Sequence, residues 1–100
     1  MKLWIDDVRP IPKDYDYHAY SVDAAKMMIL SSEDVGESIE LIDIDHDAGK
    51  YVKYGGDYIA LLDWLEETGR NYPIRIHSMN TVGVVNMRRI IQKNGWTEVK

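Results

Sequence analysis

Three short apolar runs in this chain each end in a polar cluster that carries acids or a histidine. Leu3–Ile5 leads into Asp6-Asp7, Ile39–Ile44 into Asp45-His46-Asp47, and Pro73–Ile76 into His77-Ser78-Met79-Asn80. In an open parallel α/β sheet the carboxyl ends of neighbouring strands meet along one edge, so clusters in these positions come together. The pattern predicts strands with a polar site at one edge of the sheet.

Segments with helical spacing separate these runs. We expect Ser21 to cap a helix over about residues 22–30, which Ser31-Ser32 and Gly36 end. Asp57 is expected to cap a second helix, in which Tyr58, Leu61, Leu62 and Leu65 recur at the spacing of one helix face, and Gly69 ends it. A third helix is expected from about Thr81 to Lys93, before Asn94-Gly95.

The alternation of strands and helices indicates parallel strands joined by right-handed crossovers. Residues 17–20 and 96–99 are expected to add short strands. The near-continuous apolar run at 39–44 is typical of a strand covered on both sides. We therefore predict one α/β domain over residues 1–100, with a parallel sheet of four to five strands and helices on both faces.

Charge and composition exclude several classes of function. The net charge is −5 and the 12 Lys and Arg residues are scattered, which disfavours binding to duplex nucleic acid. The absence of cysteine excludes disulfides, thiol catalysis and thiolate metal ligands. No run approaches the length of a membrane span or of a signal-peptide core, so we expect a cytoplasmic protein with no membrane partner.

The acids after the first two core strands are candidate metal ligands. Asp6, Asp7 and Asp45 offer carboxylates, which are hard ligands suited to Mg²⁺ or Mn²⁺. The alternative is that Asp6-Asp7 begins a turn and caps the backbone. Asp43 shares a strand face with Asp45, and a buried carboxylate there needs a cation or donors. A surface-facing or backbone-bonded Asp43 stays open, so Asp43 is left out of the predicted site.

The remaining residues of the clusters are candidates for acid–base chemistry and substrate binding. His46 and His77 can transfer protons near neutral pH, bind a metal or hold an anionic oxygen, although a structural histidine is the alternative. Ser78 and Asn80 are neutral donors, and Asn80 can equally cap the last helix. Arg9 is the nearest cation to the acidic pair and either pairs with it or grips a phosphate.

The chain resembles the cyclic-phosphate processing receiver domains. The resemblance spans nearly the whole chain and rests on Asp6-Asp7-Val8-Arg9-Pro10, on Ile44-Asp45-His46-Asp47-Ala48-Gly49, on Gly56-Asp57-Tyr58 with Trp64-Leu65, and on His77-Ser78-Met79-Asn80 with Gly83 and Asn86-Met87. It implies a flavodoxin-like fold in which a loop replaces the first receiver helix. By analogy with phosphoacceptor receivers, Asp6 and Asp7 match the acidic pair, Asp45 the acceptor and Ser78 the hydroxyl residue.

The resemblance implies a metal-dependent phosphoesterase whose substrate is a small cyclic phosphate ester, either a cyclic nucleotide or a cyclic-phosphate end. Asp6, Asp7 and Asp45 would hold the divalent cation, and Asp45, His46, Asp47 and His77 would be catalytic, with Asp47 orienting a histidine. Arg9, Ser78 and Asn80 would contact the ester. Two alternatives remain: a phosphoacceptor receiver with Asp45 as acceptor, for which the only candidate for the usual lysine is Lys100, and a metal- or ligand-binding module without turnover.

Overall fold

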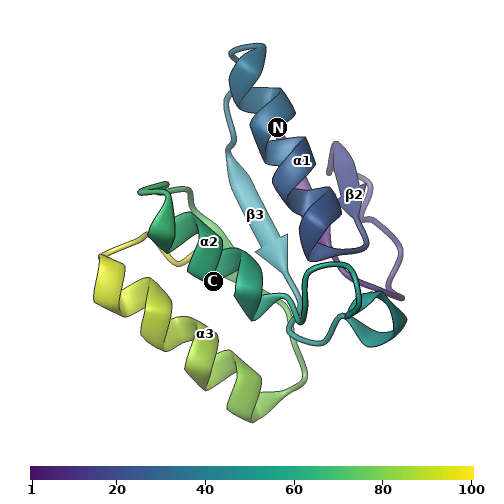
Figure 1. Ribbon diagram of the computed structural model, residues 1–100, viewed down its shortest axis with the longest axis vertical. Helices are drawn as coiled ribbons and strands as arrows, with labels where there is room; N and C mark the ends of the chain where they lie inside the picture. The colour runs from purple at the N-terminus through teal and green to yellow at the C-terminus, as the bar shows by residue number, and fades with distance from the viewer.

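Four parallel strands form the sheet in the order β2-β1-β3-β4, in a computed structural model that describes residues 1–100 (Figure 1). The strands are β1 (Lys2–Ile5), β2 (Tyr17–Ala19), β3 (Leu41–Ile44) and β4 (Ile74–Ile76). A single parallel bridge between Ile74 and Glu98 stands where a last short strand was expected. The predicted α/β receiver-like fold is confirmed, and no helix forms between β1 and β2.

Three α-helices follow the strands in sequence: α1 (Val22–Asp34), α2 (Ile59–Glu67) and α3 (Thr81–Asn94). Ser21 caps α1 and Asn80 caps α3, as predicted, because each side-chain oxygen accepts an amide hydrogen bond at the start of its helix. The prediction that α1 ends near residue 30 was wrong. The helix continues through Ser31 and Ser32, and the Ser32 hydroxyl donates to Glu37 instead of competing for the helix backbone.

The predicted cap of α2 was also wrong. Asp57 lies before the helix, and its carboxylate accepts a hydrogen bond from the Ala48 amide at 3.0 Å. This contact closes the loop between β3 and α2, which contains the short 3₁₀ helix η1 (Gly49–Tyr51). Asp57 therefore shapes a loop beside the carboxyl end of β3 instead of starting the helix.

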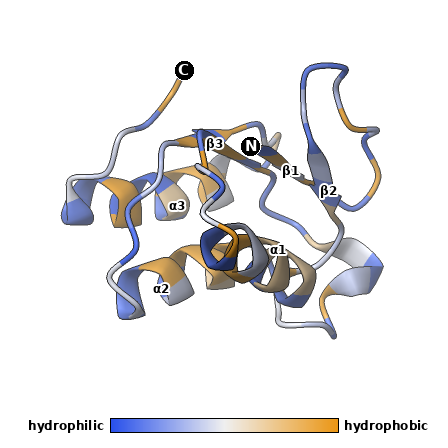
Figure 2. Ribbon diagram, turned by 90° about the horizontal axis from the view of Figure 1, so that it is seen from above, coloured by the Kyte–Doolittle hydropathy of each residue, from blue (hydrophilic) through white to orange (hydrophobic).

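All three helices pack on one face of the sheet (Figure 2). The alternate strand residues that point to this face are apolar, and most of them are fully buried: Leu3, Ile5, Ala19, Ile42, Ile44 and Ile74. They form a single core with the apolar stripes of the helices, such as Leu61, Leu62 and Leu65 of α2. The prediction of helices on both faces was wrong. The side chains on the other face of the sheet explain why no helix packs there.

The opposite face of the sheet is lined by larger and more polar side chains. By strand register, Trp4, His18, Asp43 and Arg75 share this side. The β1–β2 loop, residues 6–16, covers it in place of a helix, since the Tyr15 hydroxyl donates to Asp43 and the Trp4 indole donates to the Arg9 carbonyl. None of the helices is long and apolar enough to span a membrane.

Candidate functional site

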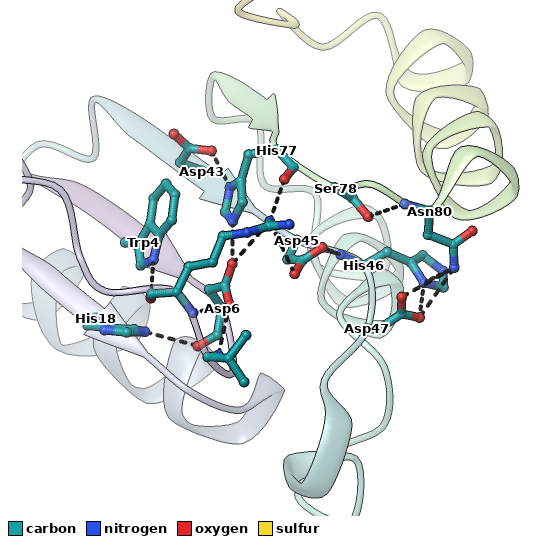
Figure 3. A network of polar contacts seen from close by, with 12 residues as sticks. Trp4, Asp6, His18, Asp43, Asp45, His46, Asp47, His77, Ser78 and Asn80 are labelled. Carbon is teal, nitrogen blue, oxygen red and sulfur yellow. Dashed lines mark hydrogen bonds and ion pairs between the residues drawn. The ribbon is translucent and has the colours of Figure 1, made fainter.

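Three acidic or histidine side chains from three neighbouring strands converge at the carboxyl edge of the sheet (Figure 3). Asp6 follows β1, Asp45 follows β3 and His77 follows β4. One oxygen of each carboxylate and one ring nitrogen of His77 all lie within 4.8 Å of one another. The topology thus brings together the ends of β1, β3 and β4, as the sequence clusters predict.

Asp6 is fully buried and is held in its ionised form by donors. Its Oδ1 accepts the amides of Val8 and Arg9 at 2.9 and 2.8 Å, and its Oδ2 lies 2.9 Å from His77 Nε2. Burial opposes ionisation, but these amide bonds and His77 outweigh it, so the pKa of Asp6 lies below its usual value. Asp6 therefore both shapes the turn after β1 and presents a charged oxygen to the site.

His77 is fixed on every side. Its Nδ1 lies 2.6 Å from Asp43 Oδ1 and its Nε2 faces Asp6, so each ring nitrogen meets a carboxylate (Figure 3). The ring also stacks on Trp4, with centroids 3.9 Å apart and planes 4° from parallel. A neutral imidazole donates from one nitrogen alone, so a ring that keeps its Nδ1 proton on Asp43 would present its Nε2 lone pair to a cation bound beside Asp6.

Asp43 is the main functional candidate that the predicted site omits. It is fully buried within β3, where its second oxygen accepts from the Tyr15 hydroxyl and lies 3.7 Å from the Arg75 guanidinium. Burial, with the hydrogen bond to Asp43, raises the pKa of Tyr15 to about 12. The sequence signal was its place on the same strand face as Asp45, between two isoleucines, where a carboxylate needs partners.

Arg9 contributes the guanidinium that lies beside Asp6 and Asp45. Its Nη1 lies 3.6 Å from Asp6 Oδ2 and 3.7 Å from Asp45 Oδ2, and it donates to the His77 carbonyl at 2.9 Å. The side chain is 41% exposed, whereas those of Asp6 and Asp45 are 0% and 12% exposed. Arg9 therefore caps the buried carboxylates from the solvent side, and it has room to move.

Asp7 lies beside the convergent group and is not one of its three members. Its Oδ2 lies against Gly49, where a Cβ atom would stand only 2.3 Å away. Gly49 has φ +54°, so both its backbone and the close approach of Asp7 favour glycine. Burial, then repulsion from Asp6 and Asp45, raises the pKa of Asp7. The carboxylates thus form a region of concentrated negative charge.

A second polar group lies on the other side of Asp45. Asp45 Oδ1 accepts the His46 amide at 2.7 Å, and the His46 ring turns away so that its Nδ1 lies 2.9 Å from Asp47 Oδ1 (Figure 3). The hydrogen bond with His46 lowers the pKa of Asp47. The Asn80 amide lies 3.3 Å from both His46 Nδ1 and Asp47 Oδ1. The other ring nitrogen, His46 Nε2, meets no polar group of the chain.

Gly83 allows His46 to take this position. The ring packs against the first turn of α3, where a Cβ on residue 83 would stand 2.4 Å from the ring. Ser78 accepts the Asn80 amide at 3.1 Å, so the turn between β4 and α3 is braced internally. Of the predicted residues, the structure thus groups Asp6, Arg9, Asp45 and His77 in one cluster and His46, Asp47, Ser78 and Asn80 beside it.

The lysine considered for phosphoacceptor chemistry is engaged elsewhere. Lys100 donates to Glu98 at 3.1 Å, and Glu98 also pairs with Arg88 at 2.7 Å. These residues lie in the C-terminal segment and on α3. The positive charge that faces Asp45 comes from Arg9.

Comparison with known proteins identifies a family. The model of the family described as Cyclic-phosphate processing Receiver domain matches residues 1–93 of the chain. The comparisons with curated proteins and with solved structures gave no match.

Proposed function

Because the chain belongs to the cyclic-phosphate processing receiver family, we propose that it hydrolyses cyclic phosphate esters at the edge formed by Asp6, Asp45 and His77. The observation that carries this proposal is the difference between the hydrogen-bond partners of His46 and those of His77. His77 has both ring nitrogens committed to carboxylates, whereas His46 is held by Asp47 at Nδ1 and keeps Nε2 free. This difference supports a role for His77 as a fixed ligand and for His46 as a proton carrier.

The donor set fits a divalent cation. Asp6 Oδ2 and His77 Nε2 are 2.9 Å apart, which is the spacing of two atoms that share one ion at about 2.1 Å from each. Asp43 behind His77 completes the carboxylate–histidine arrangement that orients metal-binding imidazoles. Two oxygens and a nitrogen suit Mn²⁺ or a similar ion better than Mg²⁺, which favours oxygen alone.

Arg9 occupies the side from which a phosphate would approach. When the carboxylates hold a cation, repulsion would turn the guanidinium outward, where its planar fork can bind two oxygens of a phosphate. A bound cation would polarise the phosphoryl group and activate water. Asp7 stays a predicted ligand because its carboxylate lies beside Asp6 and Asp45, whose repulsion adds to burial in raising its pKa.

His46 would carry the proton during ring opening. Water attacks phosphorus, one endocyclic P–O ester bond breaks, and the product is a phosphate monoester with a free hydroxyl group. The proton lost by the water passes through His46 Nε2 to the leaving oxygen, while Asp47 and Asn80 hold the ring in place. Ser78 stands at the same turn as a further donor to the ester.

Phosphorus NMR tests the proposal directly. The protein is incubated with a panel of cyclic phosphates and Mn²⁺, the ion is removed with chelator before the spectrum is recorded, and Asp45→Asn and His46→Gln are run beside it. We expect monoester signals from the native protein and at least a 100-fold slower reaction in both variants. Asp63→Asn, at an exposed position of α2, is the matched control and should behave as the native protein does.

The phosphoacceptor reading gives a different result. Incubation with a small phosphodonor, followed by intact-mass measurement, would add one phosphoryl group that is lost in Asp45→Asn. An inert cyclic-phosphate panel together with that adduct would replace the hydrolase proposal with signalling. Tight Mn²⁺ binding without either reaction would leave a binding module.

A further inference from the structure

An apolar hollow of about 450 Å³ lies between β2 and α1 (Figure 1). Five of the eight side chains that line it are hydrophobic, among them Tyr17, Met27, Met28 and Val35. Met27 and Val35 are 71% and 74% exposed. Exposed apolar side chains that gather in one concave place mark a binding surface, and methionine adapts its shape to different partners. We call this hollow the β2–α1 groove.

One wall of the groove belongs to an edge strand. β2 pairs with β1 alone, and the sheet ends there, so the outer edge of β2 has no strand partner. Tyr17 stands on the helix-covered side because it is in register with the fully buried Leu3. An extended segment that adds to such an edge presents every second side chain to a groove beside it. The β2–α1 groove has the two walls that this mode of binding needs, a strand edge and a helix.

Exposed acids surround the groove. Glu37 lines it, Asp16 directly precedes Tyr17, and Asp34 directly precedes Val35. One oxygen of Glu37 accepts from a serine hydroxyl of α1, which leaves the negative charge of the carboxylate without a cation. We call these three acids the acidic rim.

The lysines of β1 and α1 do not neutralise the acidic rim. Lys26, the single lysine of α1, stands over the Trp64 ring, 5.8 Å from its centroid. Lys2, the single lysine of β1, lies on the loop-covered side of the sheet with Trp4, since side chains alternate along a strand. The groove therefore combines apolar walls with unbalanced negative charge.

We propose that the β2–α1 groove binds an extended segment of another protein, in which alternate apolar residues are flanked by lysine or arginine. The segment adds to the edge of β2, its apolar side chains enter between Tyr17 and Met27, and its basic side chains face the acidic rim. A second copy of this chain would bring two acidic rims together, and like charges disfavour that pairing. The groove shares no residue with the cluster of Asp6, Asp45 and His77, so the inference is independent of the proposed hydrolysis.

A random peptide library displayed on phage tests what the groove selects. The library is first depleted on the Met27→Asp variant, in which a charge replaces part of the apolar wall, and is then panned on the native protein. Because Met27 is largely exposed, the variant should fold as the native protein does. We expect the enriched peptides to share alternating apolar residues beside lysine or arginine. The absence of enrichment, or enriched peptides without basic residues, would overturn the proposal.

Isothermal titration calorimetry with the most enriched peptide then locates its site. Val35→Ser should weaken binding by about fivefold, because it removes apolar contact from the groove. Val82→Ser is the matched control, since Val82 on α3 is 71% exposed and lies outside the groove, and it should leave the affinity unchanged. Equal losses in the two variants would contradict binding in the groove.

The acidic rim has its own test. Glu37→Gln keeps the shape of the side chain and removes its charge, so it should weaken peptide binding by about threefold at low ionic strength and by less at high salt. An affinity that responds neither to Glu37→Gln nor to salt would contradict the basic character of the partner.

Sedimentation equilibrium tests the competing occupant. We expect the native protein to be a monomer. A dimer that Met27→Asp dissociates would assign the groove to a second copy and overturn the proposal. Peptide binding and cyclic-phosphate hydrolysis depend on different residues, so the failure of either proposal leaves the other standing.

Discussion

The two faces of the sheet are covered in different ways and do different work. On the helix-covered face, fully buried aliphatic side chains such as Ile44 and Leu62 pack without polar partners. On the loop-covered face, Trp4, Tyr15 and Asp43 surround His77 with hydrogen bonds and a stacked ring. The helix-covered face stabilises the fold through apolar burial. The polar groups of the loop-covered face hold one histidine, His77, in place at the edge of the sheet.

The difference explains why this fold does without its first helix. A helix over β1 and β3 would have to bury an apolar stripe against Asp43 and Arg75, which offer none. The loop instead brings a hydroxyl to Asp43 and a carbonyl to the Trp4 indole. The polar face is thus matched to a loop that can supply hydrogen-bond partners.

The largest expected effect comes from the helix-covered face. Leu62→Ala removes a fully buried side chain of α2 and should lower the free energy of unfolding by about 2–5 kcal/mol. Urea denaturation measures this loss. Met27→Ala, at a position 71% exposed on α1, is the control and should change stability by less than about 0.5 kcal/mol. Mn²⁺ affinity of folded Leu62→Ala should match that of the native protein, and a large change would break the separation of the two faces.

Asp43→Asn tests the loop-covered face. The substitution leaves the shape nearly unchanged but removes the charge that orients His77, so Mn²⁺ affinity should fall by about 10- to 100-fold. Isothermal titration calorimetry measures the affinity. Asp23→Asn, on the exposed first turn of α1, provides the matched control. Unchanged Mn²⁺ binding by Asp43→Asn would show that His77 does not depend on the polar face.

The pH at which two partly buried tyrosines ionise allows a comparison of the two faces. The pKa of Tyr15 is raised from 10.0 to about 12 by burial and by Asp43, and that of Tyr72 to about 12 by burial and by Glu33. A raised pKa means that each phenol contributes stability in full below about pH 10 and loses it as pH rises through about 12. Absorbance titration near 295 nm should show these phenols ionising late.

Phenylalanine variants then assign the effect to each face. Tyr15→Phe and Tyr72→Phe should each remove one late-ionising phenol and cost roughly 1 kcal/mol at neutral pH. Mn²⁺ affinity should fall in Tyr15→Phe alone. Of the two tyrosines, Tyr15 donates to Asp43, whereas Tyr72 donates to Glu33. Equal effects of both variants on Mn²⁺ binding would argue against a distinct role for the loop-covered face.

The smallest expected effect concerns Arg9 and has the opposite sign. Arg9→Gln removes the guanidinium that stands 3.6 Å from Asp6 and 3.7 Å from Asp45, so Mn²⁺ should bind about three- to tenfold more tightly. Calorimetry at low ionic strength gives the largest difference, and Lys13→Gln, at an exposed position of the same loop, is the control. Weaker Mn²⁺ binding in Arg9→Gln would contradict competition between Arg9 and the cation.

The sequence predicts the helix-covered face better than the loop-covered one. The spacing of Leu61, Leu62 and Leu65 specifies a helix with one buried side, and the acids after β1 and β3 mark the edge because parallel strands end together. No comparable local signal in the sequence indicates on which side of the sheet each helix packs. Predicting helices on both faces therefore failed, even though the fold class was right.

The partners of Asp43 were equally hidden. Tyr15 lies 28 residues earlier, in a proline-bearing loop without periodicity, so no spacing rule pairs the two. Alternation along β3 did place Asp43 on the same face as Asp45 and showed that burial there needs partners. The sequence thus indicated that Asp43 needs partners. Only the tertiary contacts identify these partners as His77, Tyr15 and Arg75.

The ¹⁵N NMR spectrum of the His77 ring, recorded before and after addition of Zn²⁺ as a diamagnetic stand-in for Mn²⁺, tests whether the loop-covered face prepares His77 to bind a cation. The loop-covered face is claimed to fix His77 so that Nδ1–H stays on Asp43 while Nε2 joins Asp6 and Asp45 in binding a cation. We expect Zn²⁺ to shift Nε2 to the position of a coordinated nitrogen and to leave Nδ1 protonated, and we expect Asp43→Asn to weaken this response. Zn²⁺ bound elsewhere, with both His77 nitrogens unshifted, would contradict it.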